Sequence, residues 1–248
     1  MNGETDMGGR LGQFPETRRS LVIRLANDDS EESSRAWEKL VCAYWKPTYR
    51  YLRLRWNKSN EDAKDLVQDF FARALEKDFF ASFDPAKGRF RGYFRACVEA
   101  HCRNDLESSR ALKRGGHQII QQLDFEEAEG EISLIDPPDP GHDDEWFDKE
   151  WRRQIFSLAI ENLQSHCLSV GDHEKWQVFL RYDLATKDRP RYEDLAREFD
   201  VPITAITNWL SAMRGKFRNA IVEILKEQSN SEQEFQDDLG LLEGHDRK

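Results

Sequence analysis

The chain has 248 residues, of which 38% are hydrophobic and 34% charged, and its formal net charge is −10. That length allows one large or two small domains, and so polar a composition suits small helical domains better than one large core. No apolar run approaches the length of a membrane span, the N-terminal residues lack the apolar core of an export signal, and the cysteines form no CxxC pair. We therefore expect a cytoplasmic protein that spans no membrane and holds neither a metal nor a cofactor.

Strand signals are scarce and helical periodicity is common, so the sequence predicts an all-α protein. A first helical domain is expected over residues 14–114 and a second over 145–226. Residues 115–144 are strongly acidic and poor in core-forming side chains, which is typical of a flexible linker. An acidic tail, 227–248, follows. It could cover a basic helix or be inert solvated disorder, and we favour disorder.

Helical periodicity and turn residues predict where the elements lie. Candidate helices of the first domain cover residues 17–27, 33–55, 61–77 and 89–110, and those of the second cover 146–168, 172–184, 191–199 and 203–225. Pro47 is a candidate break in the second of these helices, because proline removes a helix hydrogen bond and crowds the preceding turn.

The helix expected at 61–77 separates its charges from its apolar side chains. At about 100° per residue, apolar residues fill one half, while Asp62, Asp65, Asp69 and Glu76 share the other. A di-metal carboxylate site would need Glu-x-x-His pairs on other helices, and a catalytic carboxylic acid would face an apolar pocket; the sequence indicates neither. These four carboxylates are therefore either an ordinary solvated face or an acidic ridge that docks on a basic partner.

A basic segment covers residues 87–114, where eight basic and three acidic side chains occur and arginines alternate with aromatic rings. Cations that follow phosphates, together with rings that stack on unpaired bases, are the combination that holds single-stranded DNA. In the alternative interpretation Phe90 and Phe94, spaced i and i+4, belong to the core, and the basic residues are a solvated face.

The stretch "RYEDLAREFDVPITAITNWLSAMRGKFRNAIVEIL" carries a helix-turn-helix pattern. Asp200 occupies the tight turn, where it tolerates left-handed φ, and Pro202 starts the next helix, where its missing N–H costs nothing. Donors and cations suited to base edges and phosphates lie on the outer face of that helix: Thr204, Thr207, Asn208, Ser211, Arg214 and Arg218. The alternative is a helical hairpin that packs on another element. Trp209 is expected to pack against Trp176 or Phe179.

Taken in chain order, these segments resemble the extracytoplasmic-function sigma factors of bacterial RNA polymerase. "DAKDLVQDFFARAL" resembles region 2.2, which docks on the coiled coil of the polymerase β′ subunit. "GRFRGYFRACVEAHCRNDL" resembles regions 2.3 and 2.4, which melt and read the −10 element, and "YEDLAREFDVPITAITNWLSAMRGKFR" is similar to region 4.2, which reads the −35 element. The resemblance implies two helical domains and no enzymatic activity. It also implies core polymerase (β′ and β subunits) and promoter DNA as partners, with an anti-sigma factor as a further candidate.

Site residues follow from the same resemblance. The polymerase-docking set is Asp62, Asp65, Gln68, Asp69 and Phe71, the last shared between the core and the partner. The set that melts and reads −10 DNA is Arg89, Phe90, Arg91, Tyr93, Phe94, Arg95, Arg103 and Asn104. The set that reads −35 DNA is the outer face of the second helix of the helix-turn-helix. Two other functions remain as alternatives: a stand-alone helix-turn-helix regulator, and a nuclease or deaminase that uses the carboxylates.

Overall fold

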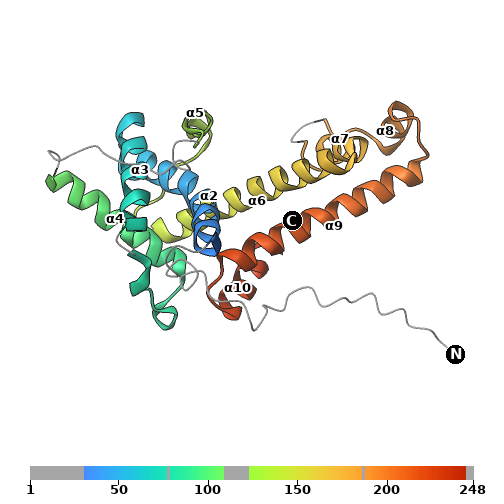
Figure 1. Ribbon diagram of the computed structural model, residues 1–248. Coiled ribbons are helices and arrows are strands. Elements are labelled where there is room, and N and C mark those ends of the chain that lie inside the picture. The colour runs from blue at the N-terminus through green and yellow to red at the C-terminus, as the bar shows by residue number, and fades with distance from the viewer. Residues whose placement is uncertain (1–30, 77–78, 109–122, 186–187, 244–248) are drawn as a thin grey trace. The chain divides into compact units, whose positions relative to one another are not determined.

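The computed structural model describes residues 31–76, 79–108, 123–185 and 188–243, and every regular element within these ranges is helical (Figure 1). The all-α prediction is therefore confirmed, while the helix expected at 17–27 lies outside the described residues. The chain divides into two compact units, one formed by residues 1–154 with 225–248 and the other by 155–224. Among the described helices, none is long and apolar enough to cross a bilayer.

Among the described elements, unit 1 contains five helices that lie wholly within it, parts of two more, and short 3-10 turns. Its helices are α2 (Glu31–Leu54), α3 (Asn60–Glu76), α4 (Phe90–Ser108), α5 (Phe125–Gly130), the start of α6 (Asp143–Val170), the end of α9 (Ile203–Gln228) and α10 (Glu232–Glu243); its 3-10 turns are η1 (Phe79–Ser82), η2 (Pro85–Lys87) and η4 (Ile132–Leu134). Unit 2 holds the rest of α6 and α9 together with α7 (His173–Tyr182) and α8 (Tyr192–Glu198).

Helix α2 forms the centre of unit 1, and every residue from Ala43 to Leu52 is buried. The ring of Tyr44 lies 4.4 Å from that of Phe94 on α4, and Phe70 on α3 lies 5.3 Å from the same Phe94 ring. Each large apolar side chain removed from water in this way contributes roughly 1.5–3 kcal/mol. The aromatic core therefore fixes α3 and α4 on α2.

Pro47 lies inside α2 without ending it. A proline within a helix removes one hydrogen bond, here the one to the Ala43 carbonyl, and its ring crowds that turn. Here the Thr48 hydroxyl donates to the Tyr44 carbonyl at 2.7 Å, and the Gln154 amide donates to the Cys42 carbonyl at 2.9 Å. Side chains thus supply donors around the gap, and the helix continues through the candidate break.

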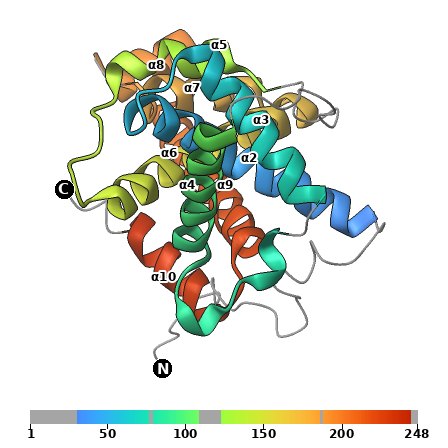
Figure 2. The same cartoon turned by 90° about the vertical axis from the view of Figure 1, so that its left-hand side faces the viewer.

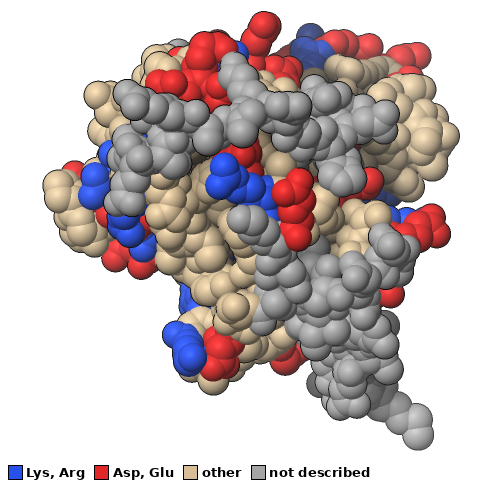
Figure 3. All heavy atoms as spheres, turned by 60° about the vertical axis from the view of Figure 1, so that its left-hand side comes forward, with Lys and Arg blue, Asp and Glu red and all other residues tan. Residues whose placement is uncertain are grey.

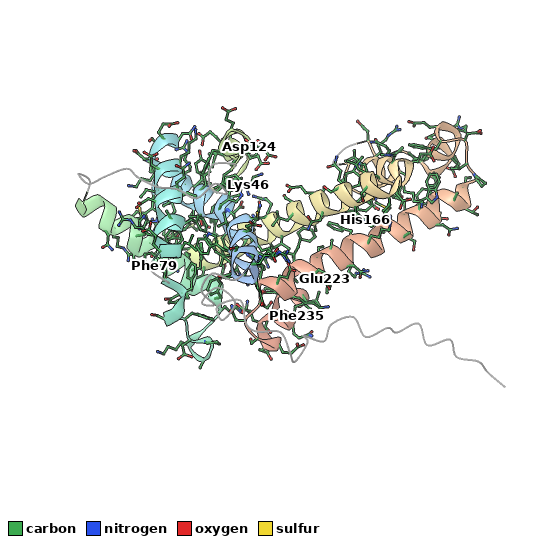
Figure 4. All side chains as sticks on the ribbon, in the orientation of Figure 1. Lys46, Phe79, Asp124, His166, Glu223 and Phe235 are labelled. Carbon is green, nitrogen blue, oxygen red and sulfur yellow. The ribbon has the colours of Figure 1, made fainter. Side chains whose placement is uncertain are left out.

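The described part of the expected linker is folded against α2. Phe125 lies between two α2 rings, 5.2 Å from that of Trp45 and 5.4 Å from that of Tyr49. Lys46 donates to Glu127 at 2.6 Å, and other glutamates of this segment pair with α2 arginines (Figure 4 labels Lys46 and Asp124, the residue before α5). The expectation of a flexible linker is therefore wrong for residues 123–134. Its charges are neutralised by α2, which composition alone could not reveal.

Unit 2 contains the helix-turn-helix formed by α8 and α9. Asp200 adopts φ +51°, the left-handed conformation expected of the turn, and the Val201 N–H donates to the Ala196 carbonyl at 3.0 Å. A buried cluster formed by Val178, Leu195, Ala196, Ile206 and Leu210 holds the two helices together. Trp209 packs against this cluster. It was expected to pack against Trp176 or Phe179, but those two residues belong to a separate cluster with Leu163, Cys167 and Met213.

Candidate nucleic-acid and polymerase interface

The acidic ridge lies on the outer face of α3. Ser59 begins the helix: its hydroxyl accepts from the Asp62 N–H at 3.1 Å and donates to the Asp62 carboxylate at 2.7 Å. Negative charge in the first turn is also favoured by the helix dipole. Asp62 and Asp65 are exposed, whereas Gln68 and Asp69 are partly exposed. Four of the five predicted docking residues are thus accessible along one helix.

Asp69 connects the ridge to α4. It accepts from Arg73, four residues later, at 2.9 Å, and His101 Nε2 lies 3.2 Å from the same carboxylate oxygen. The His101 side chain is buried, with its ring edge-on to Phe70 at 5.6 Å. An ion pair as exposed as Asp69–Arg73 contributes little stability, so a partner can replace Arg73 at low cost.

Phe71 does not lie at the edge of the apolar half, as expected, but inside the core. Its side chain is fully buried, and its ring lies 6.1 Å from that of Trp37 and 6.0 Å from that of Phe94. The prediction that Phe71 is shared with a partner is therefore wrong for this structure. Helical periodicity placed it on the apolar half but could not show that α2 covers that edge.

Phe90 and Phe94, predicted to act in melting, are also fully buried. Phe94 packs on Tyr44 and Phe80, whereas the Phe90 ring meets Phe83 at 5.3 Å. The core alternative is therefore correct for both rings. The mixture of rings and cations in this segment reflects a helix with an aromatic inner side, and neither ring can stack on a base without leaving the core.

The described arginines of the same segment are paired with carboxylates. Arg89 meets Asp237 at 3.0 Å, Arg91 meets both Asp148 and Asp238, and Arg95 meets Asp144 at 2.7 Å as well as Glu99. On the face drawn in Figure 3, basic side chains likewise lie next to acidic ones in several places. Within residues 87–108, the part of the basic stretch that the structure describes, the arginine charges are thus largely neutralised.

Tyr93, Arg103 and Asn104 remain accessible to different extents. Tyr93 is partly buried and its hydroxyl donates to the Phe79 carbonyl at 2.8 Å; burial is the main cause that raises its pKa to about 12. Arg103 is exposed, donates to Glu99 at 2.9 Å and lies over the Trp56 ring, and Asn104 is exposed beside it. Together with Arg89, which is exposed although paired with Asp237, these three residues are the most accessible part of the predicted −10 set.

The outer face of α9 keeps all six of its predicted DNA-reading side chains exposed. The Thr207 hydroxyl donates to the Thr204 carbonyl at 2.9 Å, which directs it back onto the first turn. Arg214 forms a two-pronged pair with Asp183 at 2.8 and 2.9 Å, and this hydrogen bonding raises the Arg214 pKa. The structure therefore brings the six residues onto one helix face. Among the described residues, the carboxylate that pairs with this face is that of Asp183, at the end of α7, and its partner is Arg214.

Helix α10 was missed by sequence reasoning. The tail begins with Ser231 and Glu234, the S-x-x-E spacing of a capping box. The Ser231 hydroxyl does accept from the Glu234 N–H at 3.1 Å, and Phe235 and Leu242 are buried on the inner side. The expectation of a disordered tail is wrong for residues 232–243, and the capping pattern was the signal that could have shown it.

No arrangement of three or more histidine, cysteine or acidic side chains suited to a metal ion occurs in the described part of the chain. The family model for sigma-70 region 2 matches residues 42–111, from within α2 to beyond the described end of α4. Neither the curated proteins nor the solved structures contain a match to this chain. The matched segment includes the acidic ridge and the basic segment around α4. Residues 42–111 are therefore similar to sigma-70 region 2.

Proposed function

We propose that this protein is a dissociable promoter-specificity subunit of bacterial RNA polymerase, of the extracytoplasmic-function type. In this proposal unit 1 docks on the core polymerase through the acidic ridge and contacts the −10 element through α4. Unit 2 reads the −35 element through α9. The protein itself carries out no covalent chemistry; it positions polymerase and DNA.

One observation carries the proposal: the segment that matches sigma-70 region 2 exposes carboxylates on α3 while burying the apolar half of that helix. Carboxylates spaced i and i+4 repel and lower the stability of a helix by a few tenths of a kcal/mol each. A partner surface rich in lysine or arginine would remove that repulsion. Asp65 and Asp69 lie four residues apart near the middle of α3, away from the stabilising first turn.

Unit 2 supports the DNA-binding part of the proposal. The second helix of a helix-turn-helix enters the major groove with its N-terminal residues at the base edges. Thr204, Thr207 and Asn208 occupy the first two turns of α9 and can supply donors and acceptors there, and Arg218 lies further along the exposed face, where phosphate contacts are expected. This arrangement depends on the left-handed turn residue Asp200, which sets the direction of α9.

The docking assignment is tested with a pull-down of core polymerase by the full chain, followed by runoff transcription. The double variant Asp65→Lys, Asp69→Lys is expected to weaken polymerase binding about tenfold or more, because it puts cations against a basic surface. The matched control is Glu32→Lys with Glu38→Lys, which makes the same charge change on exposed residues of α2. Equal binding by the two double variants would reject the ridge as the docking surface.

The second candidate function is a stand-alone helix-turn-helix regulator. It is favoured because the DNA-reading face of α9 is exposed, whereas Arg89, Arg91 and Arg95 at α4 are already paired with carboxylates. Tight sequence-specific binding of duplex DNA by the isolated chain, with no stimulation of runoff transcription by core polymerase, would establish that function instead. The sigma-factor proposal expects the reverse result: weak duplex binding alone and promoter-specific transcripts in the presence of the core enzyme.

A further inference from the structure

Helix α10 lies beside one end of α4 (Figure 2). Three of its carboxylates form hydrogen bonds with residues at the beginning of α4. Asp238 accepts two hydrogen bonds from the Arg91 guanidinium, at 2.7 and 2.8 Å. Asp237 accepts from Arg89 at 3.0 Å, and Glu234 accepts from the backbone N–H of Phe90 at 3.0 Å. Acidic side chains of the tail therefore occupy donors on three consecutive residues, Arg89 to Arg91, at the start of α4.

The innermost of these contacts is deeply buried. The Arg91 side chain is 2% exposed and that of Asp238 is 3% exposed. Asp148 meets Arg91 from the other side at 2.8 Å, and the guanidinium lies over the Trp151 ring at 4.1 Å. Burial by itself lowers the Arg91 pKa, but Asp238 and Asp148 raise it more, so the net pKa lies above its ordinary value and Arg91 stays charged.

The covered cations are the ones that the proposed function assigns to DNA. A guanidinium can bind a carboxylate or a phosphate through the same bidentate pair of hydrogen bonds. Arg89 and Arg91 hold α10 carboxylates with donors that a DNA backbone would need. Carboxylate and phosphate cannot both occupy them, so contact between α10 and α4 and binding of DNA at this end of α4 exclude each other.

The attachment of α10 combines a buried inner contact with an outer pair that solvent reaches. The helix has 12 residues and follows a short connection after α9. The outer pair, Arg89 with Asp237, is partly exposed to solvent, with 43% and 34% of the two side chains accessible. Such a pair is screened by salt and contributes little. The buried carboxylate of Asp238, which accepts two hydrogen bonds from Arg91, therefore contributes most to holding α10 on α4.

We propose that α10 is an autoinhibitory strap: its carboxylates stand in for DNA phosphates on Arg89 and Arg91, and single-stranded DNA must displace it. This inference rests on the proposed function, because it takes α4 to be a DNA-binding helix. At equilibrium, α10 is released from α4 in only a small fraction of the molecules, and only these have Arg89 and Arg91 available for DNA. The apparent affinity for DNA is reduced by that fraction.

The test compares two variants that each remove one negative charge from α10 of the full-length chain. Asp238→Asn breaks the two-pronged pair with Arg91, while Arg91 keeps Asp148. Glu232→Gln is the control, because Glu232 lies on the exposed side of α10, where it accepts from Gln236 at 2.6 Å. Affinity is measured for a labelled oligothymidylate of about 12 nucleotides, a length that a short binding groove covers.

Asp238→Asn is expected to bind the oligonucleotide about tenfold more tightly than the unmodified chain, the change that follows if the unstrapped fraction rises tenfold. Glu232→Gln is expected to stay within about twofold, because it leaves that fraction unchanged. Equal affinity of the two variants, or no binding by either, would overturn the proposal.

A second measurement uses the unmodified protein and separates a strap from a structural brace. Amide hydrogen exchange of α10 is followed with and without saturating oligonucleotide. Faster exchange in α10 on binding supports displacement, whereas unchanged or slower exchange shows that α10 remains in place and overturns the strap. Both variants should bind core polymerase as the unmodified chain does. Loss of polymerase binding by all three would therefore reject the proposed function, whereas normal polymerase binding with equal DNA affinities would reject only the strap.

Discussion

Replacing Phe94 by alanine separates a core role from a DNA-stacking role for the basic segment. The side chain is fully buried at the point where α2, α3 and α4 meet. Its ring lies 4.4 Å from Tyr44, 5.3 Å from Phe70 and 5.7 Å from Phe80. If Phe94 is a core residue, the loss must appear in the stability of the protein with no DNA present.

The magnitude follows from these contacts. Truncation of a buried phenylalanine to alanine costs about 3–5 kcal/mol, and each close aromatic pair adds about 0.5–1.5 kcal/mol beyond simple burial. With several ring partners lost, we expect about 4–5 kcal/mol for Phe94→Ala. Since total stability is typically about 5–15 kcal/mol, this loss brings unit 1 near unfolding. Phe94→Leu nearly conserves volume and should cost about 1.5 kcal/mol, which keeps the effect measurable in a folded protein.

The assay is urea unfolding followed by circular dichroism, with amide hydrogen exchange to assign the loss to α2, α3 and α4. Arg103→Ala on the same helix is the control, because its side chain is 61% exposed and its loss should change stability by no more than about 0.5 kcal/mol. The core role is refuted if Phe94→Leu and Phe94→Ala both have the same urea midpoint as the Arg103→Ala control but no longer bind single-stranded DNA.

Three further outcomes are expected. Asp200→Gly should raise the stability of unit 2 by up to about 1 kcal/mol in urea unfolding, since glycine adopts the observed φ of +51° without strain; a clear loss would contradict this. Hydrogen bonds from Lys175 and Lys216 lower the pKa of Asp172 to about 2, below the ordinary value of 3.8. The stability that this carboxylate contributes is therefore present above about pH 4 and is lost as pH falls toward 2. The difference in melting temperature between the unmodified chain and Asp172→Asn should shrink over that range, and a constant difference would show that the ion pairs do not act. Phe125→Ala should release α5, seen as faster amide exchange there, while exchange in α3 stays unchanged; equal acceleration in both helices would show that α5 is part of the cooperative core of unit 1.

Local pattern predicted the longer helices and those of the helix-turn-helix, but it missed α5 and α10. Seven helices were predicted within the described part of the chain. Each of them begins and ends within three residues of the helix that the structure shows there. The reason is that apolar spacing, capping side chains and turn residues act over a few positions. The left-handed turn at Asp200 and the outward ridge on α3 follow from the same short-range rules. Both were therefore predictable from sequence.

Partners distant in sequence were not predictable in this way. Periodicity identified an apolar half on α3 and on α4, but only the packing of α2 showed that Phe71, Phe90 and Phe94 are all enclosed. Arg91 looked like a cation free for DNA, yet its carboxylate partner Asp238 lies 147 residues later.

By itself, therefore, the sequence determined the helices other than α5 and α10, the turn between α8 and α9, and the separation of charged from apolar faces. The tertiary structure alone decided which basic side chains remain open to a ligand, because the pairing of charges depends on which helices fold against one another. The acidic segments of α5 and α10, both expected to be solvated, instead pair with cations of α2 and of the start of α4, as carboxylates of α6 also do.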